Sequence, residues 1–444
     1  MNTLIKIGTT LNLTSSSGVL TQPQAVIVKS FIGGGGQGEV YKVLAYGKEY
    51  ALKWYFKRNQ KKALKDNLKA LIKLGSPSEN FLWPKQLVEH GGQFGYLMEL
   101  RQENYKKSQK LMEREFSLSY SLVCNVALNL ADSFRKLHVK GLSYQDISWG
   151  NIFIDPEDGK ILICDNDNIA PHGSNTIGIS GTYGFMAPEV VLNEQKPDQY
   201  SDLFSLAILL FQILFLEHPF NGRRWANIAC WDDYAKKKLY GSEPIFIFDP
   251  VNKENRPMIG VQDNAKIFWN MYPRHIHECF INVFTKGLKN RENGRLLEED
   301  WIEAFRVLRE SIMICPACGR EVIFKEKEGL KCWGKNCEAE LPPPPRLKIK
   351  LGKRERIIVL NPNTKLYTYQ LTSHEPDFIK GDIPLGEMVQ SPENPNKWGI
   401  RNLSKEPWSC TRKDETKETP PGKAFVLNSG IKINFKTATG ELII

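Results

Sequence analysis

The sequence predicts an α+β protein made of several domains, and three observations support this prediction. Residues 25 to about 100 carry strand patterns with alternating apolar side chains, and one basic helix at about 59–74. Residues 110 to about 310 are mostly helical in pattern, whereas strands and turn signals dominate from residue 347 onward. The Pro-rich stretch LPPPPR at 341–346 is stiff and extended, so we interpret it as a linker between domains.

The bulk composition predicts a globular protein outside the membrane. The chain has 444 residues, enough for about two to four domains, and 41% of them are hydrophobic. Its formal charge of +10 fits an anionic partner such as a nucleotide, although the basic residues are spread out. The densest basic stretch, 57–74, is either one solvated helix face or an anion-binding patch. No N-terminal signal is visible, and the most apolar segment, 203–216, is too short to span a bilayer, which predicts a buried helix.

A run of glycines provides the first functional signal. The stretch IGGGGQGEVYKV matches the pattern G-x-G-x-x-G-x-V through Gly33, Gly35, Gly38 and Val40. Glycines let the backbone approach a ligand closely, but many tight turns carry the same pattern. Strand patterns flank the run on both sides, which favours a phosphate-covering loop between two strands over a dinucleotide-binding fold.

Further motifs follow the glycine run in order. YALKWY places Lys53 on the next strand, where a lysine can reach the α- and β-phosphate oxygens of a nucleotide. Asp146 and Asn151 have the spacing D-x-x-x-x-N, in which the aspartate can accept a hydroxyl proton and the asparagine can bind a metal ion. Asp165 ends an apolar strand and would chelate magnesium. YLMEL at 96–100 and an A-P-E motif complete the series, an order that disfavours chance turns in an α+β protein.

With these motifs, residues 25–312 resemble the Hanks-type, eukaryotic-like serine/threonine protein kinases. The resemblance implies a bilobal fold whose N-terminal lobe ends near residue 101, after a short lead-in at residues 1–24. It also implies ATP and Mg²⁺ as cofactors and protein hydroxyls as substrates. By resemblance, the residues that would contact ATP are Ile32, Gly33, Gly35, Gly38, Val40, Ala51, Lys53, the gatekeeper Met98, the hinge from Glu99 to Arg101, and Phe153.

The resemblance also assigns catalytic and structural roles. Catalysis would depend on Lys53, Asp146, Asn151 and Asp165, of which Asn151 and Asp165 would bind Mg²⁺. Thr182 matches the threonine of the substrate-docking loop, which in serine/threonine kinases contacts the catalytic aspartate. The structural matches are Asp202, which opens the buried central helix, and Arg295, which pairs with Glu189 of the A-P-E motif.

The chain departs from the family pattern at several points. The usual H-R-D reads Y-Q-D at 144–146, so a phosphorylated activation loop would lack its usual arginine partner. The usual D-F-G reads D-N-D at 165–167. We interpret Asp167 as a turn residue, with metal ligation as the alternative. Ser148 replaces the lysine that usually follows the catalytic aspartate by two residues, which removes one positive charge from the γ-phosphate.

The helix after Lys53 lacks the glutamate that usually pairs with this lysine. No glutamate precedes Glu79, which lies in a turn, so the ion pair is missing or altered. The apolar face of the helix nominates Asn67 for this position, and a shift of one residue nominates Asp66. An asparagine could hydrogen-bond the lysine without matching its charge. Because every group that would touch metal or proton remains, we predict an active kinase, with an ATP-binding pseudokinase scaffold as the alternative.

Four cysteines have the spacing of a metal site. Cys315, Cys318, Cys332 and Cys337 form C-x2-C-x13-C-x4-C, which predicts a tetrahedral structural zinc site in a ribbon at 313–340, with unliganded thiols or disulfides as alternatives. The other cysteines are scattered, which predicts a reducing compartment, the cytoplasm. A nucleic-acid-binding ribbon would interleave aromatic and basic residues on one element, a pattern that the sequence lacks.

Residues 347–444 resemble a forkhead-associated-like β-sandwich through WGIRNLSKEPWSC and PPGKAFVLNSGIKINF. The phosphothreonine-reading motifs of such domains are not found, and TSHEPD at 372–377 does not match S-x-x-H, which favours scaffolding or autoregulation. The domain combination and the phrases GGGGQGEVYKV and CDNDN resemble bacterial kinases of tellurite-resistance-type (TerY-P) phosphorylation triads. That resemblance implies a PP2C-type phosphatase and a von Willebrand A protein as partners.

Overall fold

The computed structural model of the chain divides into two compact units. The first comprises Met1–Leu118, Asn125–Asn270 and His277–Ile302, and the second comprises Ser119–Cys124, Met271–Ile276 and Glu303–Ile444. The residues that the structure describes are 4–13, 25–174, 181–326, 329–334, 336–372, 383–394 and 397–444. Most of the predicted lead-in and most of TSHEPD therefore lie outside the described residues.

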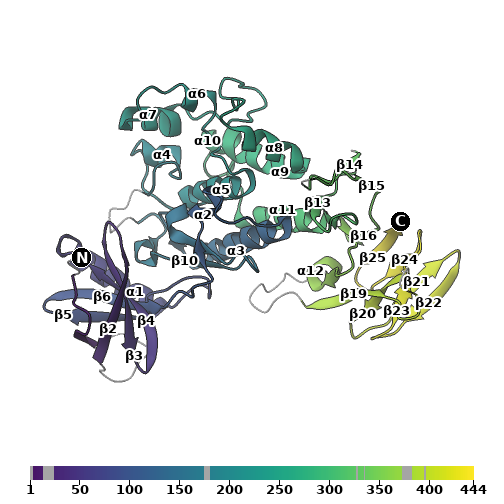
Figure 1. Cartoon of the computed structure of the whole chain (residues 1–444), viewed down its shortest axis with the longest axis horizontal. Helices are drawn as coiled ribbons and strands as arrows, with labels where there is room; N and C mark the ends of the chain where they lie inside the picture. Colours follow the sequence, from purple (N-terminus) through teal and green to yellow (C-terminus); the bar gives the residue numbers. More distant parts are fainter. Residues whose placement is uncertain are drawn as a thin grey trace. The chain divides into compact units, whose positions relative to one another are not determined.

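The N-terminal lobe of the first unit is a closed antiparallel barrel in the described part of the chain. Its strands follow the order β1 (Thr10–Leu13), β2 (Ala25–Gly34), β3 (Gly38–Ala45), β4 (Lys48–Tyr55), β6 (Gln93–Glu99) and β5 (Gln86–His90), which pairs back with β1. The basic helix predicted at about 59–74 is present as α1 (Lys62–Leu74) (Figure 1). Its buried residues Leu64 and Leu68 lie one turn apart and pack against Tyr96 and Met98 of β6, so the helix covers one side of the barrel.

Helices dominate the second lobe, from α2 onward. The long helices are α3 (Tyr120–Val139), α5 (Gln199–Phe215), α8 (Asp263–Met271), α9 (Arg274–Ile281) and α11 (Glu298–Glu310). The shorter ones are α2 (Gln109–Met112), α4 (Pro188–Val191), α6 (Arg223–Ala226), α7 (Asp233–Lys237) and α10 (Gly287–Lys289), with π-helical turns at Lys238–Ser242 and Asn282–Lys286. The predicted buried helix is α5, in which every residue from Ser201 to Phe215 is buried. Across the described residues, no helix is both long and apolar enough to cross a membrane.

Short strands position the loops of this lobe. β9 (Ile152–Ile154) pairs with β10 (Ile161–Ile163) and with β7 (Lys106–Lys107), and β8 (Leu142–Ser143) pairs with β11 (Ala170–Pro171). The Y-Q-D motif therefore follows β8, and the D-N-D motif follows β10. Each of these loops contains one 3₁₀ turn, at Trp149–Asn151 and at Asn166–Asn168 respectively.

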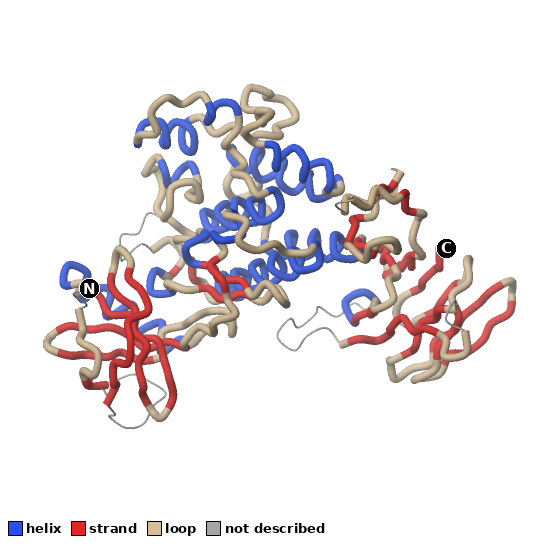
Figure 2. The backbone as a smooth tube through the Cα atoms, viewed as in Figure 1, coloured by secondary structure: helices blue, strands red, loops and turns tan. Residues whose placement is uncertain are grey.

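The second unit is rich in strands (Figure 2). Two short hairpins come first, β12 (Ile312–Ile314) with β13 (Glu321–Ile323), and β14 (Leu330–Lys331) with β15 (Glu340–Leu341). One larger sheet in the described residues has the order β17 (Arg354–Val359), β16 (Arg346–Leu351), β25 (Thr439–Ile443), β24 (Lys432–Asn434), β21 (Trp408–Arg412) and β22 (Glu415–Thr419). The other has the order β18 (Lys365–Tyr367), β19 (Pro384–Gln390), β20 (Trp398–Asn402) and β23 (Ala424–Val426), with α12 (Thr368–Leu371) between β18 and β19. Trp408 and Leu347 of the first sheet share a core with Ile400 of the second, which makes the region a β-sandwich.

Candidate active site

The glycine run forms the turn between β2 and β3, as the flanking strand patterns predict. Gly33 pairs with Val40 across the two strands, and the Gly35 amide donates to the Gly38 carbonyl at 2.9 Å. Gly38 is required by close packing, because a Cβ atom there would lie 2.1 Å from the carbonyl oxygen of Trp54. Gly33 and Gly35 would meet nothing within 4 Å, so they leave open space around the turn.

Lys53 lies on β4 in register with Tyr96 of β6, and its side chain is buried beneath the glycine run. Its Nζ atom donates to Asp165 at 3.2 Å, to both oxygens of Asp167 at 2.9 Å, and to Gln37 of the glycine run at 3.0 Å. Burial disfavours the charged form of Lys53, but the attraction of Asp167 and Asp165 outweighs it and raises the pKa of the ammonium above its ordinary value. The lysine is therefore held as a cation.

The predicted catalytic residues of the loop after β8 lie together. The Thr182 hydroxyl donates to Oδ1 of Asp146 at 2.7 Å, and Nδ2 of Asn151 donates to the backbone oxygen of Asp146 at 2.8 Å and to Oδ2 at 3.2 Å. Burial raises the pKa of Asp146, although the hydrogen bonds from Thr182 and Asn151 act against it. A carboxylate with a raised pKa binds a proton more readily, which suits a general base.

Asp202 of α5 fixes the backbone of this loop. Its carboxylate accepts from the amides of Tyr144 at 2.5 Å and of Gln145 at 2.9 Å, so a residue in the first turn of α5 also holds this loop. His138 of α3 also contacts Asp202, at 3.2 Å, and forms a second ion pair with Glu298 of α11. Burial lowers the pKa of His138, but hydrogen bonds to Asp202 and Glu298 outweigh this effect and raise it to about 9. Sequence reasoning missed this histidine.

The predicted pair of Arg295 and Glu189 is present. The guanidinium of Arg295 donates to both oxygens of Glu189 at 2.8 Å, in the bidentate geometry that suits arginine and carboxylate. Arg295 is buried and also donates to the backbone oxygen of Tyr200 at 2.9 Å. The pair therefore ties the A-P-E segment to the first turn of α5.

Some of the residues expected around adenine lie together in one apolar cluster, and others lie outside it. Ala51 and Met98 pair across β4 and β6 and are buried in one apolar cluster, against which Val40 also packs. Ile32, by contrast, is 46% exposed on β2. Phe153 of β9 lies under the guanidinium of Arg101, whose central carbon is 4.6 Å from the ring centroid. The carboxylate of Glu99 forms ion pairs with Lys48 and Lys85, which leaves the hinge role expected for this residue to its backbone.

The two broken motifs have specific local partners. Gln145, with φ at 72°, donates from Nε2 to the backbone oxygen of Ser174 at 2.6 Å and to the hydroxyl of Ser143 at 3.2 Å. Asp167 lies in a 3₁₀ turn, as the interpretation as a turn residue implies, but its carboxylate is fully buried and pairs with Lys53. Neither a turn role alone nor metal ligation anticipates that contact.

The expected hydrogen bond between Asn67 and Lys53 is corrected by the structure. Nδ2 of Asn67 donates to the backbone oxygens of Asp167 at 3.2 Å and of Ile169 at 2.9 Å, while Asp66 is exposed on α1. The reason is that the position nearest the lysine is already occupied by the Asp167 carboxylate, which also matches its charge. The extra carboxylate in D-N-D and the missing glutamate on α1 were both visible in the sequence, and together they could have suggested this pairing.

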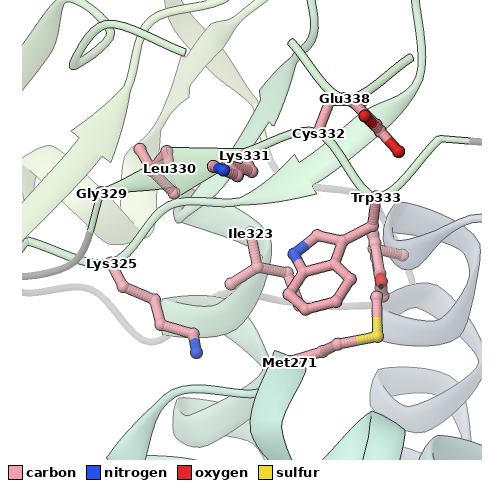
Figure 3. A pocket seen from close by; sticks show the side chains of 10 residues that line it. Met271, Ile323, Lys325, Gly329, Leu330, Lys331, Cys332, Trp333 and Glu338 are labelled. Atoms are coloured by element: carbon pink, nitrogen blue, oxygen red, sulfur yellow. Dashed lines mark hydrogen bonds between the residues drawn. The ribbon is translucent and has the colours of Figure 1, made fainter. Parts of the chain in front are cut away.

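The four predicted metal-ligating cysteines come together in the second unit. Their sulfur atoms all lie within 4.8 Å of one another, with Cys315 and Cys337 3.8 Å apart and Cys318 and Cys332 3.5 Å apart. Thiolates around a tetrahedral zinc ion at about 2.3 Å stand roughly 3.8 Å from each other, so the donor set fits zinc. A cavity of about 500 Å³ adjoins Cys332, and Figure 3 shows the indole of Trp333 beside Met271 and Ile323 within it.

Comparisons with known proteins agree with this geometry. The model of the protein kinase domain matches residues 26–255, just over half of the chain. A dual specificity protein kinase, shkB of Dictyostelium discoideum, is 25% identical over 258 residues, which cover 54% of this chain and 36% of that protein. Human beta-adrenergic receptor kinase 1 is 29% identical over 210 residues, 44% of this chain and 29% of that protein. A probable serine/threonine-protein kinase, PLK of D. discoideum, is 27% identical over 290 residues, which cover 61% of this chain and 29% of that protein. The matched region thus spans well under half the length of each of these relatives.

Proposed function

Because the chain belongs to the protein kinase family, we propose that it transfers the γ-phosphate of ATP to serine or threonine hydroxyls of protein partners. The observation that carries this proposal is the contact of Thr182 with Asp146, at 2.7 Å, beside Asn151. In the serine/threonine kinases that the chain resembles, this threonine contacts the catalytic aspartate. The name of one relative, the probable serine/threonine-protein kinase PLK of D. discoideum, supports the same class of acceptor.

ATP would lie between the glycine run and the apolar surface of the barrel. Val40, Ala51, Met98 and Phe153 would contact adenine, and backbone groups from Glu99 to Arg101 would hydrogen-bond its edge. The ammonium of Lys53 would contact phosphate oxygens as a point charge. The open space beside Gly33 and Gly35 allows the backbone to approach those phosphates closely.

Asn151 and Asp165 fit the role of Mg²⁺ ligands. Asn151 uses its Nδ2 atom to donate to Asp146, so its amide oxygen is the atom that would bind a cation. The Asp165 side chain is 45% exposed, whereas that of Asp167 is fully buried. Bound Mg²⁺ would neutralise charge on the β- and γ-phosphates.

Asp146 would receive the proton of the attacking hydroxyl. Its carboxylate is oriented by Thr182 on one oxygen and by Asn151 on the other, so the aspartate is fixed before substrate arrives. The pKa raised by burial favours proton acceptance during transfer. Placement and charge, more than covalent chemistry, would therefore supply the rate acceleration.

The test is transfer of radiolabelled phosphate from ATP to the chain itself or to a generic protein substrate in the presence of Mg²⁺. We expect label in the wild type on serine or threonine, and loss of label in Asp146→Asn, which keeps the shape of the side chain but cannot accept the proton. Nucleotide affinity is measured on both proteins as a control. A wild type that binds ATP without transferring phosphate would contradict the enzyme and support the pseudokinase scaffold.

We further propose that Cys315, Cys318, Cys332 and Cys337 hold one structural zinc ion in a ribbon. The sulfur distances support this assignment, and zinc would stabilise a segment too small for a sizeable core of its own. Elemental analysis should find one zinc per chain in the wild type and a loss in Cys315→Ser/Cys332→Ser. Wild-type protein that is folded and without zinc would contradict the site.

The partners proposed from the TerY-P resemblance are a PP2C-type phosphatase and a von Willebrand A protein in a bacterial cytoplasm. In that arrangement the β-sandwich at 347–444, which we propose to be forkhead-associated-like, would serve as a scaffold or an autoregulatory domain. Copurification of the full chain with such proteins, compared with a chain ending at residue 346, tests this role. Equal recovery by both chains would place the partner surface outside the sandwich.

A further inference from the structure

Asp167 is surrounded by donors. Its two oxygens accept from Nζ of Lys53 at 2.9 Å, from the hydroxyl of Tyr55, and from the hydroxyl of Tyr96 at 3.4 Å. An ionised carboxylate offers about four acceptor sites, so these contacts occupy most of its capacity. The side chain has no exposed surface, and a buried charge persists in a protein only when it is paired and hydrogen-bonded.

The donors come from one face of the barrel sheet. Lys53 and Tyr55 are two residues apart on β4, so their side chains point to the same side, and Tyr96 stands opposite Lys53 on β6. Each of these side chains is buried. The turn after β10 therefore inserts one carboxylate into a group of donors that the barrel provides.

Helix α1 contacts the same turn in a different way. Asn67 donates to the backbone oxygen of Asp167 at 3.2 Å and to that of Ile169 at 2.9 Å. The helix thus holds the turn in place but supplies no carboxylate to the lysine, since Asp66 is exposed on another face.

We propose that Asp167 is the positioning residue that orients Lys53 toward the nucleotide phosphates, in place of the glutamate that α1 lacks. The proposal rests on the nucleotide binding that the proposed function includes, because the orientation of Lys53 matters only for a chain that binds nucleotide. The orienting carboxylate then belongs to the turn that also carries Asp165. The turn after β10 therefore positions both the lysine, through Asp167, and the metal ligand Asp165, and it needs no carboxylate on α1 to do so.

Metal ligation by Asp167 is the competing role, and the contacts disfavour it. A cation would have to displace Lys53 or a tyrosine hydroxyl from an oxygen of Asp167, in a position closed to solvent. Asp165 is the better ligand, because its side chain is 45% exposed. Lys53 contacts both carboxylates. In this arrangement Asp167 orients the lysine and Asp165 is left to bind the metal ion.

The test compares Asp167→Asn with Asp66→Asn, a matched change of carboxylate to amide on α1. Affinities for ADP and for adenosine are measured without Mg²⁺. We expect Asp167→Asn to weaken ADP binding by about tenfold to a hundredfold, the range for a charge-assisted hydrogen bond, and to leave adenosine binding within about twofold. Asp66→Asn should leave both affinities within about twofold, since that side chain is exposed.

Three outcomes would overturn the proposal. ADP affinity unchanged without Mg²⁺, but a higher Mg²⁺ requirement for transfer, would make Asp167 a metal ligand. Equal losses for ADP and adenosine would mean that the substitution acts through the fold. An equal loss in Asp66→Asn would return the role to the helix.

A folding control keeps the test valid if Asp167→Asn proves unstable. Lys53→Met/Asp167→Asn removes both charges, so it should melt no lower than Asp167→Asn, in which the lysine is left buried beside one fewer carboxylate. If the two substitutions simply add in lowering the melting temperature, the pair is not coupled and the proposal is wrong. A wild type that binds ADP but transfers no phosphate would end the proposed function and leave this inference standing.

Discussion

Two loops of the active site depart from the family pattern in opposite directions. The loop after β8 loses a positive charge at Gln145, and the loop after β10 gains a negative charge at Asp167. Gln145 meets the backbone oxygen of Ser174, a neutral acceptor that requires no charged donor. Asp167 meets Lys53, a buried cation that requires a carboxylate. The comparison teaches that a substitution in a motif is understood from the partner that the new side chain contacts.

The largest expected effect concerns the loop after β10, which we call the charged loop, and its partner Lys53 on β4. Lys53→Met and Asp165→Ala should each reduce phosphoryl transfer by about 10²-fold or more, because each residue stabilises charge on the triphosphate. Radiolabel transfer at saturating ATP and Mg²⁺ measures the loss. Normal turnover in either variant would show that the charged contacts of Lys53 and Asp165 are not needed for transfer, and it would reject the site assignment.

A smaller effect is expected from the loop after β8, which contains Gln145 and which we call the neutral loop. Gln145→Leu removes the donor to Ser174 and leaves a partly buried carbonyl without it, which should lower kcat by about tenfold, in line with the cost of an unsatisfied group. Affinity for ADP should remain within about twofold, because Gln145 contacts the activation segment and the Lys53 side chain lies elsewhere.

Gln145→Met serves as the matched control, since it keeps the side-chain length but has no N–H group to donate. It should behave like Gln145→Leu in kcat. A loss of ADP affinity as large as that expected for Asp167→Asn would show that the two loops are not distinct in role.

A third expectation concerns the pH dependence of stability around the neutral loop. His138 holds Asp202, which in turn holds the amides of Tyr144 and Gln145. Its pKa is raised to about 9 in the folded chain, so its stabilising contribution is complete below the ordinary value near 6.5 and is lost as pH rises through about 9. The melting temperature of the wild type should therefore fall between pH 7 and pH 9.5, and that of His138→Gln should fall less. An equal decline in both would exclude the histidine as the cause.

Much of the fold and site was predictable because local pattern and motif order carry it. The strand, glycine turn and strand around Gly38 and the buried helix α5 follow from patterns within short segments. The approach of Thr182 to Asp146 was expected from the resemblance to serine/threonine kinases. The partner of Lys53 was not predictable in the same way. It depends on β4, β6 and the turn after β10 meeting in space, across more than 100 residues of sequence. His138 was missed for the same reason, since its two carboxylate partners lie far along the chain.

The smallest expected effect concerns phosphorylation of the activation segment. In many kinases a phosphate on this segment is held by the arginine before the catalytic aspartate, and that pairing orders the segment. The candidate acceptors in this chain are Ser174, Thr176, Ser180, Thr182 and Tyr183, of which Thr176 and Ser180 lie outside the described residues. Gln145 already binds the backbone of Ser174 at 2.6 Å without any phosphate. The amide of Gln145 lacks both the positive charge and the two-pronged donor geometry with which an arginine pairs a phosphate, so phosphorylation would gain little at this position.

The variant that tests this expectation is Ser174→Ala/Thr176→Ala/Ser180→Ala, assayed after phosphatase treatment beside a treated wild type. Thr182 is left intact, because its hydroxyl donates to Asp146 at 2.7 Å and its loss would lower activity for a different reason. We expect rates within about twofold, because Gln145 carries no charge with which to hold a phosphate on this segment. The backbone contact of Gln145 survives the change at Ser174, as it uses the main-chain oxygen. A transfer rate more than about tenfold below that of the wild type would mean that a cation elsewhere in the chain holds a phosphate on this segment. The order of the segment would then depend on charge, and the argument from Gln145 would fail.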